Sequence, residues 1–557
     1  MFISVMFYLP VHAQKLTIEG LPTDLSQNVL DHMSGIKAND LEHFSHKHLS
    51  KIVRQSLQPF GYYQPTVHLD RDNPGNGKII VEKGNPVRVE KLDILLLGEA
   101  QQDEDFLLAL EQSELKLGQI LKHQQYDNLK TRLRSLALTK GYFDAEFTAT
   151  KLEVVPSQYK ATIVLHFNSG RRYRFGATDV EGSQIREDRV DNLKPFDSGD
   201  FFDAQKLNEY QVQLAKAGWF KQLSVKADID NANTNLELPI EVTVAPSSEN
   251  IVQVGGGYAT DIGLRGSLRW SQPWYNDRGH SFDSEVSLSE PEQLLNLGYK
   301  IPNHDVLSDY YAVQFGINHV DYLDTKRFTS DLTFEKHWNL TPDWQSTVYL
   351  KYLFEDYTQA SDEDSIQFLM PGISFSYLEQ KVESTEIRHR HLLSLEYSDP
   401  YLFSNSRILR MTGESVMSWN ITEKQKFHLR ANVGANFTDD LSDIPSSLRF
   451  FVGGDGSLRG YDYESISPSD KNGELIGALY MASAGFEYQY NVYGSFWLGT
   501  FLDIGDAFDH TPDLKKGTGI SVIWDSKLVP IKLDFAYGLD ADQGDEFRLH
   551  FSLGTQF

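Results

Sequence analysis

Hydrophobic and polar residues alternate with a period of two through the second half of the chain. In the segment 531–537, for example, Ile531 and Leu533 alternate with Lys532 and Asp534. Turn-forming residues separate about sixteen such segments, and an even number of amphipathic strands is typical of a bacterial transmembrane β-barrel. A soluble β-sandwich would also alternate, because it hides one face of each sheet in a core. The number and length of the segments favour the barrel, which we place at residues 249–557.

The N-terminal part follows a different pattern, in which a glycine and two aromatic residues recur about 80 residues apart. Each of these sites follows an amphipathic helical pattern. We therefore expect the glycine to end a helix and the aromatic pair to open a strand. The three sites lie at 60–63, 140–143 and 217–220, and further strands are expected at 78–81, 161–167 and 236–244.

These repeats predict three small α+β modules, at residues 14–86, 87–171 and 172–248. Modules of this kind expose the edges of their sheets, and an exposed edge can pair with a strand from a partner protein. The same modules can also serve as rigid spacers, and the sequence leaves both roles open.

The composition narrows the classes of function. The chain contains no cysteine, which rules out disulfides and thiolate chemistry. Its formal net charge of −26 disfavours nucleic acid as a partner. Neither a nucleophile elbow, a zinc-protease motif nor a phosphate-binding Walker loop occurs. We therefore expect no enzyme, and we assign no catalytic residue, metal or cofactor.

The two ends of the chain carry signals typical of export and membrane insertion. Residues 1–13 are apolar and end in Val11-His12-Ala13, which resembles the end of a secretory signal peptide cleaved after Ala13. A short buried strand is the alternative for this segment. At the other end an amphipathic strand finishes in Phe557, an aromatic terminus of the kind by which outer-membrane barrels are recognised for insertion.

One segment of the barrel half, at residues 450–461, breaks the alternation. Its four glycines permit a tightly folded loop that tucks into the barrel lumen. An unpaired charge there would be costly, so Arg459 requires an acidic partner. Alternation turns Glu487 and Asp503 inward on neighbouring strands, and we predict that both meet Arg459. The predicted lumenal motif comprises Gly453, Gly454, Asp455, Arg459, Gly460 and Tyr461.

These features resemble the superfamily of outer-membrane assembly factors that joins POTRA domains to a barrel, and that includes BamA, the two-partner secretion transporters and TamA. In that superfamily an arginine–glycine–aromatic motif lies in the lumen and meets an acidic–glycine strand. Here the motif would be 459–461 and the strand 501–505, with Gly505 beside Asp503. The three repeats and the runs 256–261, 279–281 and 290–293 are similar to the TamA family in particular.

The resemblance implies a barrel in the outer membrane of a Gram-negative cell, in contact with its lipid, and three POTRA domains in the periplasm. It also implies two kinds of protein partner. Clients would be outer-membrane proteins of the β-barrel or autotransporter type. A TamB-like protein, anchored in the inner membrane, would meet the POTRA domains.

The mechanism implied by this family needs no cofactor. The barrel closes by pairing its first and last strands, and a weak seam there can open and offer an edge to a client strand. Gly255, Gly256 and Gly257 lack side chains that would pack the first strand, and Gly554 lets the last strand bend. Relief from crowding is the alternative explanation for glycines in strands. The predicted seam comprises these four glycines and Phe557.

The main alternative function is a two-partner secretion pore that exports one large protein. Such pores usually carry two POTRA domains and a plug helix before them. Three repeats, with no room for the plug, favour the assembly factor.

Overall fold

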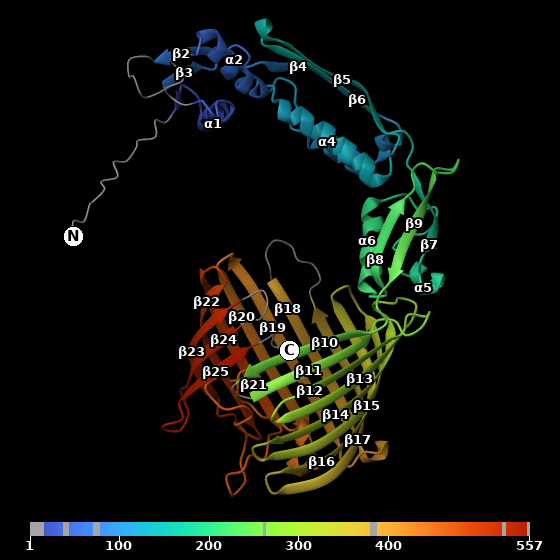
Figure 1. The fold of residues 1–557 in the computed structure, drawn as a ribbon, viewed down its shortest axis with the longest axis vertical. Helices are drawn as coiled ribbons and strands as arrows, with labels where there is room; N and C mark the ends of the chain where they lie inside the picture. The colour runs from blue at the N-terminus through green and yellow to red at the C-terminus, as the bar shows by residue number, and fades with distance from the viewer. Residues whose placement is uncertain are drawn as a thin grey trace, which may run out of the picture. The chain divides into compact units, whose positions relative to one another are not determined.

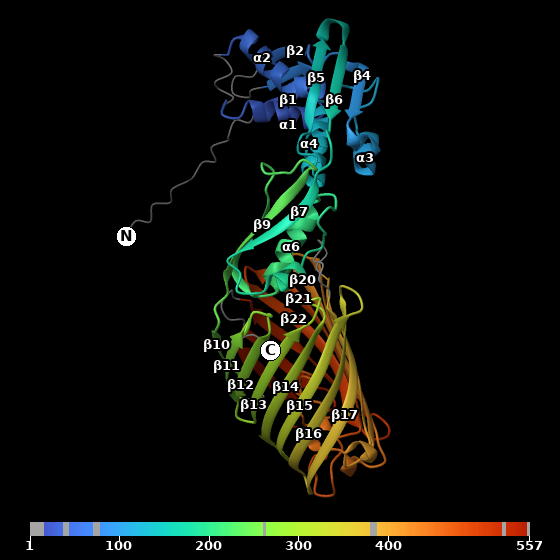
Figure 2. The same cartoon turned by 90° about the vertical axis from the view of Figure 1, so that its right-hand side faces the viewer.

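The structure is a computed structural model, and it describes residues 16–36, 44–70, 78–259, 263–378, 387–525 and 531–553. The predicted leader at residues 1–13 lies outside the described residues, as do Gly554 and Phe557. The described chain forms three small modules of helices and strands and one closed β-barrel, drawn in Figures 1 and 2. None of the described helices is long and apolar enough to cross a membrane.

Each N-terminal module is a three-stranded sheet with helices, and its last strand along the chain occupies the centre of the sheet. The strand orders are β1-β3-β2, β4-β6-β5 and β7-β9-β8. The first module contains β1 (Thr17–Glu19), α1 (Thr23–His32), α2 (His46–Leu57), β2 (Thr66–Asp70) and β3 (Lys78–Glu82). The second contains β4 (Arg88–Leu97), α3 (Glu104–Glu111), α4 (His123–Lys140), β5 (Glu146–Val155) and β6 (Lys160–Asn168). The third contains β7 (Arg174–Glu181), α5 (Glu187–Asp191), α6 (Ala204–Lys216), β8 (Phe220–Ala227) and β9 (Glu237–Pro246).

The core of each module is formed by apolar residues that recur at every second position of its strands and at every third or fourth position of its helices. The central strand β6 buries every second residue, including Ile163, Leu165 and Phe167. The facing helix α4 buries residues at helical spacing, among them Leu129 and Leu133. The predicted strands at 78–81, 161–167 and 236–244 are thus confirmed as the centres of the three sheets.

The repeated glycines end helical segments as predicted. Gly61, Gly141 and Gly218 all have positive φ angles, which a residue without a β-carbon adopts at no steric cost. The expectation that the following aromatic pair opens a strand is wrong in the first two modules. There β2 begins at Thr66 and β5 at Glu146, and only β8 opens on its aromatic residue.

The first aromatic side chain of the pair is buried in all three modules, as Tyr62, Tyr142 and Trp219. Tyr142 packs edge-on against Phe106 in the core of the second module, and its hydroxyl donates a hydrogen bond to Asp103. Burial raises the pKa of Tyr142 to about 12.

The barrel consists of sixteen antiparallel strands, β10 to β25, and each pairs with its neighbour along the chain. The first eight are β10 (Ile251–Ala259), β11 (Gly263–Gln272), β12 (Ser281–Leu288), β13 (Glu292–Pro302), β14 (Tyr310–Tyr322), β15 (Thr325–Asn339), β16 (Trp344–Gln359) and β17 (Asp362–Leu378). The second eight are β18 (Ile387–Ser398), β19 (Ile408–Thr422), β20 (Gln425–Phe437), β21 (Tyr480–Tyr493), β22 (Phe496–Phe508), β23 (Lys515–Trp524), β24 (Ile531–Gly538) and β25 (Phe547–Leu553). The strand β25 pairs with β10 and closes the barrel.

Alternation along the strands separates an apolar exterior from a polar interior. On β22, Leu502 is exposed while the adjacent Asp503 is buried. On β24, likewise, Phe535 is exposed while the adjacent Asp534 is buried. This pattern is the one that a lipid-facing barrel with a polar lumen requires.

Candidate functional site: the inward-folded loop and the barrel seam

The long connection between β20 and β21 contains a tight turn that carries the predicted motif. Within it, Gly453 N–H donates to the Ser457 hydroxyl at 2.9 Å, and Leu458 N–H donates to the Gly454 carbonyl at 3.0 Å. Both glycines have positive φ angles, so side chains there would strain the turn. The turn presents Arg459 to the strands that line the lumen.

Arg459 is 2% exposed and sits between three carboxylates. Its Nε and Nη2 bind the two oxygens of Asp503 at 2.7 and 2.9 Å, and its Nη1 lies 2.5 Å from a Glu487 oxygen. A third acid, Asp534, is 3.4 Å from Nη1, and the guanidinium also lies 3.5 Å from the centre of the Phe501 ring. The structure therefore brings Arg459 together with both acidic residues that alternation turned inward. Paired, bidentate contacts of this kind offset the cost of burying the charges.

The cluster also contains charges that the sequence analysis did not assign to it. Arg430 donates to Asp503 at 2.8 Å and to the backbone carbonyl of Asp455 at 2.5 Å, while Lys532 lies 3.0 Å from Asp534 and 3.3 Å from Glu487. Three cations thus face three carboxylates. The sequence does place Arg430, Lys532 and Asp534 on the polar face of their strands. Alternation gives no register between strands, however, so it could not bring these residues to Arg459.

Glycines on the barrel wall provide the space that this cluster occupies. A β-carbon at Gly485 would lie 2.6 Å from both Arg430 and Asp503, which reach one another across β21 at this residue. A β-carbon at Gly517 would overlap the backbone carbonyl of Arg459. These strand glycines allow close approach of the loop to the wall, which is one of the reasons for glycine in a strand.

The residues after Arg459 continue along the inside of the last strands. Gly460 N–H donates to His550 Nε2 at 3.3 Å, and a β-carbon at Gly460 would lie 2.8 Å from the backbone nitrogen of Gly538. The Tyr461 hydroxyl donates to the Lys516 carbonyl at 3.2 Å. Asp462 then accepts two hydrogen bonds from Arg548 of β25, at 2.9 and 3.0 Å. The loop thereby holds β23, β24 and β25 from within.

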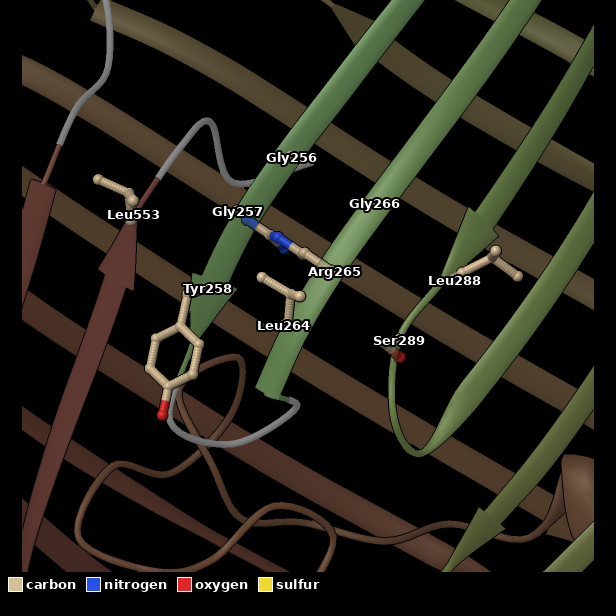
Figure 3. Close-up of a pocket in the computed structure, with 9 residues that line it drawn as sticks. All are labelled: Gly256, Gly257, Tyr258, Leu264, Arg265, Gly266, Leu288, Ser289 and Leu553. Atoms are coloured by element: carbon tan, nitrogen blue, oxygen red, sulfur yellow. The ribbon is translucent and has the colours of Figure 1, made fainter.

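The predicted seam is the closure between β10 and β25. The strand β10 pairs with β11 along its whole length, but within the described residues it meets β25 only where Tyr258 faces Leu553 and Ala259 faces Ser552. Figure 3 shows Tyr258 and Gly257 beside Leu553, at a pocket of about 550 Å³ on the barrel wall. A β-carbon at Gly257 would lie 2.5 Å from the Leu553 carbonyl oxygen.

Of the remaining predicted residues that the structure describes, Gly255 and Gly256 lie on β10 and Gly505 lies on β22. Gly255 and Gly256 lie on β10 opposite Ser267 and Gly266 of β11, and the nearest atom to a β-carbon at Gly256 would be 3.9 Å away. Among the described residues, crowding therefore explains glycine at 257 but not at 256. Gly505 lies against Ser483 on β21 rather than at Arg459. Gly554 and Phe557 lie outside the described residues.

Comparison with known protein families finds two matches along the chain. Residues 250–557 match the family model described as the Omp85 superfamily domain. Residues 15–82 match the model described as POTRA domain TamA domain 1. The two matches cover the barrel and the first N-terminal module.

Individual relatives are more distant. The chain is 24% identical over 420 residues to the outer membrane protein assembly factor BamA of Nitratidesulfovibrio vulgaris, which covers 68% of this chain and 50% of that protein. It is 22% identical over 575 residues to BamA of Neisseria meningitidis serogroup B, which covers 86% of this chain and 68% of that protein. The chain therefore spans about half the length of the first relative and about two thirds of the second.

A solved structure shares the fold. The crystal structure of BamA from Haemophilus ducreyi lacking POTRA domains 1–3 superposes with a TM-score of 0.69 at 15% identity, and covers 84% of this chain and all of that one. The fold is thus a closed outer-membrane barrel preceded by POTRA-like domains, which places those domains in the periplasm.

Proposed function

We propose that this chain, which belongs to the Omp85 superfamily, helps to insert other β-barrel proteins into the outer membrane through the seam between β10 and β25. The proposal is supported by the Omp85 match over the barrel and by the closure itself, where the described residues pair Tyr258 with Leu553 and Ala259 with Ser552. Backbone N–H and C=O groups that lack a partner strand are a template for β-augmentation. A client strand can pair with such an edge while its own barrel is still incomplete.

The finer proposal is a TamA-type factor with a TamB-like partner. It is supported by the match of residues 15–82 to the first POTRA domain of TamA and by the presence of three modules. The partner, anchored in the inner membrane, would bind the POTRA domains, and the clients would include autotransporter-type proteins. Full-length chain is expected to co-purify with this partner from detergent extracts, and a variant that lacks residues 15–82 is expected to lose it while its barrel still folds. Retention of the partner by the truncated variant would refute this assignment.

Opening of the seam is tested by locking it with a disulfide. Tyr258→Cys and Leu553→Cys place two thiols on directly paired residues, and the chain has no cysteine of its own to interfere. In cells that contain only this variant, surface assembly of an autotransporter client is expected to fall on oxidation and to recover on reduction. The matched control is Val348→Cys with Ile373→Cys, a directly paired position between β16 and β17.

The control pair is expected to leave client assembly unchanged under the same oxidant. Full client assembly by the oxidised seam variant would refute the proposal of lateral opening. If clients are inserted normally without the protein, but one soluble protein no longer reaches the medium, the chain is a secretion pore instead.

A further inference from the structure

The outer rim of the barrel can be located from the pairing of its strands. The strand β10 follows the periplasmic domains, so it starts on the periplasmic side, and each hairpin then reverses the direction. The strand β18 is the ninth of sixteen and therefore ends on the outer side. Its connection to β19, at residues 399–407, lies across the barrel from the seam between the first and sixteenth strands.

A row of large residues marks the lipid boundary at this rim. Tyr397 of β18 is paired with Leu409 of β19, which is paired in turn with Phe437 of β20. The Phe437 ring lies 6.1 Å from the ring of Tyr480 on β21. The residues adjacent to this row include Glu396, which is buried, and Arg410, which is half-buried, and the two form an ion pair on the lumenal face, so the row itself faces outward. Aromatic girdles of this kind lie at the interface of lipid and water.

Beyond this row the β18–β19 connection presents three uncharged side chains to the outside. The short helical turn η5 (Pro400–Leu402) and the next residue expose Tyr401 by 91%, Leu402 by 38% and Phe403 by 80%. They continue an exposed stripe on β18 formed by Leu393, Leu395 and Tyr397. The apolar surface of the barrel therefore runs on past the end of the strand.

This apolar tip is held in one conformation by polar contacts at its base. Asp399 accepts hydrogen bonds from the Tyr401 backbone N–H at 3.0 Å, from the Tyr397 hydroxyl at 2.7 Å and from Arg407 Nε at 2.8 Å. On the neighbouring strand β17, the Gln367 backbone N–H donates to the Asn405 side-chain oxygen at 2.7 Å. The Asn405 backbone N–H in turn donates to the Gln367 carbonyl at 3.0 Å. The side chains at the tip are thus exposed on a fixed scaffold.

We propose that Tyr401, Leu402 and Phe403 insert into the interfacial layer of the outer leaflet and anchor the barrel wall opposite the seam. The occupant is lipid because the tip is continuous with the lipid-facing stripe and carries no charge of its own. An aromatic side chain with an apolar body and a polar hydroxyl, such as Tyr401, suits this layer. Contacts at the base leave the tip little freedom to withdraw, so the anchor is formed before it meets the membrane. The proposal does not depend on the assembly of client proteins.

The test uses the absence of native cysteine, which makes every label unique. Tyr401→Cys is labelled with the environment-sensitive dye NBD and reconstituted into vesicles of phosphatidylcholine and phosphatidylglycerol. Some of the phosphatidylcholine carries a spin label near the ester end of its acyl chain and quenches dyes at that depth. Leu395→Cys on β18 is the lipid-facing reference, and Lys471→Cys in the exposed part of the β20–β21 connection is the aqueous reference.

Quenching at position 401 is expected to be comparable with that at position 395 and several-fold greater than that at position 471. Quenching no greater than at position 471 would overturn the proposal, because the tip would then stand in water or against another protein. Phe403→Cys provides a second labelled position should Tyr401→Cys fail the heat-modifiable gel shift that reports a folded barrel. For Phe403→Cys too, quenching comparable with that at position 395 is expected, and quenching no greater than at position 471 would overturn the proposal.

Discussion

The two sides of the barrel wall are built in different ways. On the side across from the seam, β15, β16 and β17 contain 15, 16 and 17 residues and pair with one another almost from end to end. At the seam, β10 contains 9 residues and β25 contains 7 within the described chain, and they meet at two successive residues. A strand that crosses a bilayer needs about 9–11 residues, so the far-wall strands extend well beyond that length.

The β20–β21 connection contacts both sides of the wall from within, but through different residues. On the far wall, Arg449 binds Tyr357 and Asp362, and the Ser447 N–H donates to Glu355 at 3.0 Å, in addition to the long ladders of backbone hydrogen bonds. The last strands are held from inside by the loop, through Arg459 to Asp534 on β24, Gly460 to His550 and Asp462 to Arg548 on β25. At the seam these lumenal contacts add to the ladder that β25 forms with β24.

The largest loss of stability is expected from removal of Arg459, the central cation of the cluster. Arg459→Ala leaves Asp503, Glu487 and Asp534 close together and buried without their shared partner. Loss of one partner from a buried ion cluster costs about 3–5 kcal/mol, so the free energy of unfolding is expected to fall by that order. The measurement is the urea midpoint of the detergent-solubilised barrel, followed by its heat-modifiable gel mobility. The far wall provides the control.

The matched control for this prediction is Arg390→Ala on β18, an arginine of the far wall that pairs with Glu414 of β19. It is expected to lower the midpoint less than Arg459→Ala does. Equal effects of the two substitutions would contradict the view that the loop cluster is what holds the seam side together. A charge exchange, Arg459→Glu with Asp503→Arg, is expected to recover part of the loss.

Much of this architecture could be predicted from the sequence because it depends on local periodicity. The three central strands, the glycines at 61, 141 and 218, and the inward turn of Glu487 and Asp503 all follow from spacing along one segment. The inclusion of Arg430 and Lys532 could not be predicted, because it depends on register between strands far apart in the chain. The pairing of Asp462 with Arg548 spans 86 residues and a folded loop, and no periodic signal encodes it.

An intermediate effect is expected at the seam itself. In Gly257→Ala the new β-carbon would lie 2.5 Å from the backbone carbonyl of Leu553, so β10 and β25 must separate slightly. Overpacking of this kind costs about 1–3 kcal/mol, and the closer of the two contacts is the one with the last strand, since the Arg265 side chain of β11 lies 3.0 Å away. Amide hydrogen exchange of β25 is expected to accelerate, while that of β16 and β17 stays unchanged. Gly256→Ala is the control, since the nearest atom among the described residues would be 3.9 Å away.

If Gly256→Ala accelerated exchange as much as Gly257→Ala, the cause would be loss of backbone freedom in β10 rather than contact with the last strand. If exchange rose equally in the far wall, the seam would not be a separate unit of opening. Either result would remove the contrast between the two sides of the barrel.

The smallest effect is expected from the ion pair that joins the loop to the last strand. Arg548 and Asp462 remain 27% and 56% exposed, so water screens their attraction, and an exposed pair contributes about 0–1 kcal/mol. Arg548→Gln is therefore expected to leave the urea midpoint nearly unchanged, yet to raise hydrogen exchange in β25, because Arg548 is itself on that strand. A large fall in the midpoint would show that this pair is part of the same cooperative unit as the Arg459 cluster. In that case the last strand could not leave β10 unless the whole loop moved with it.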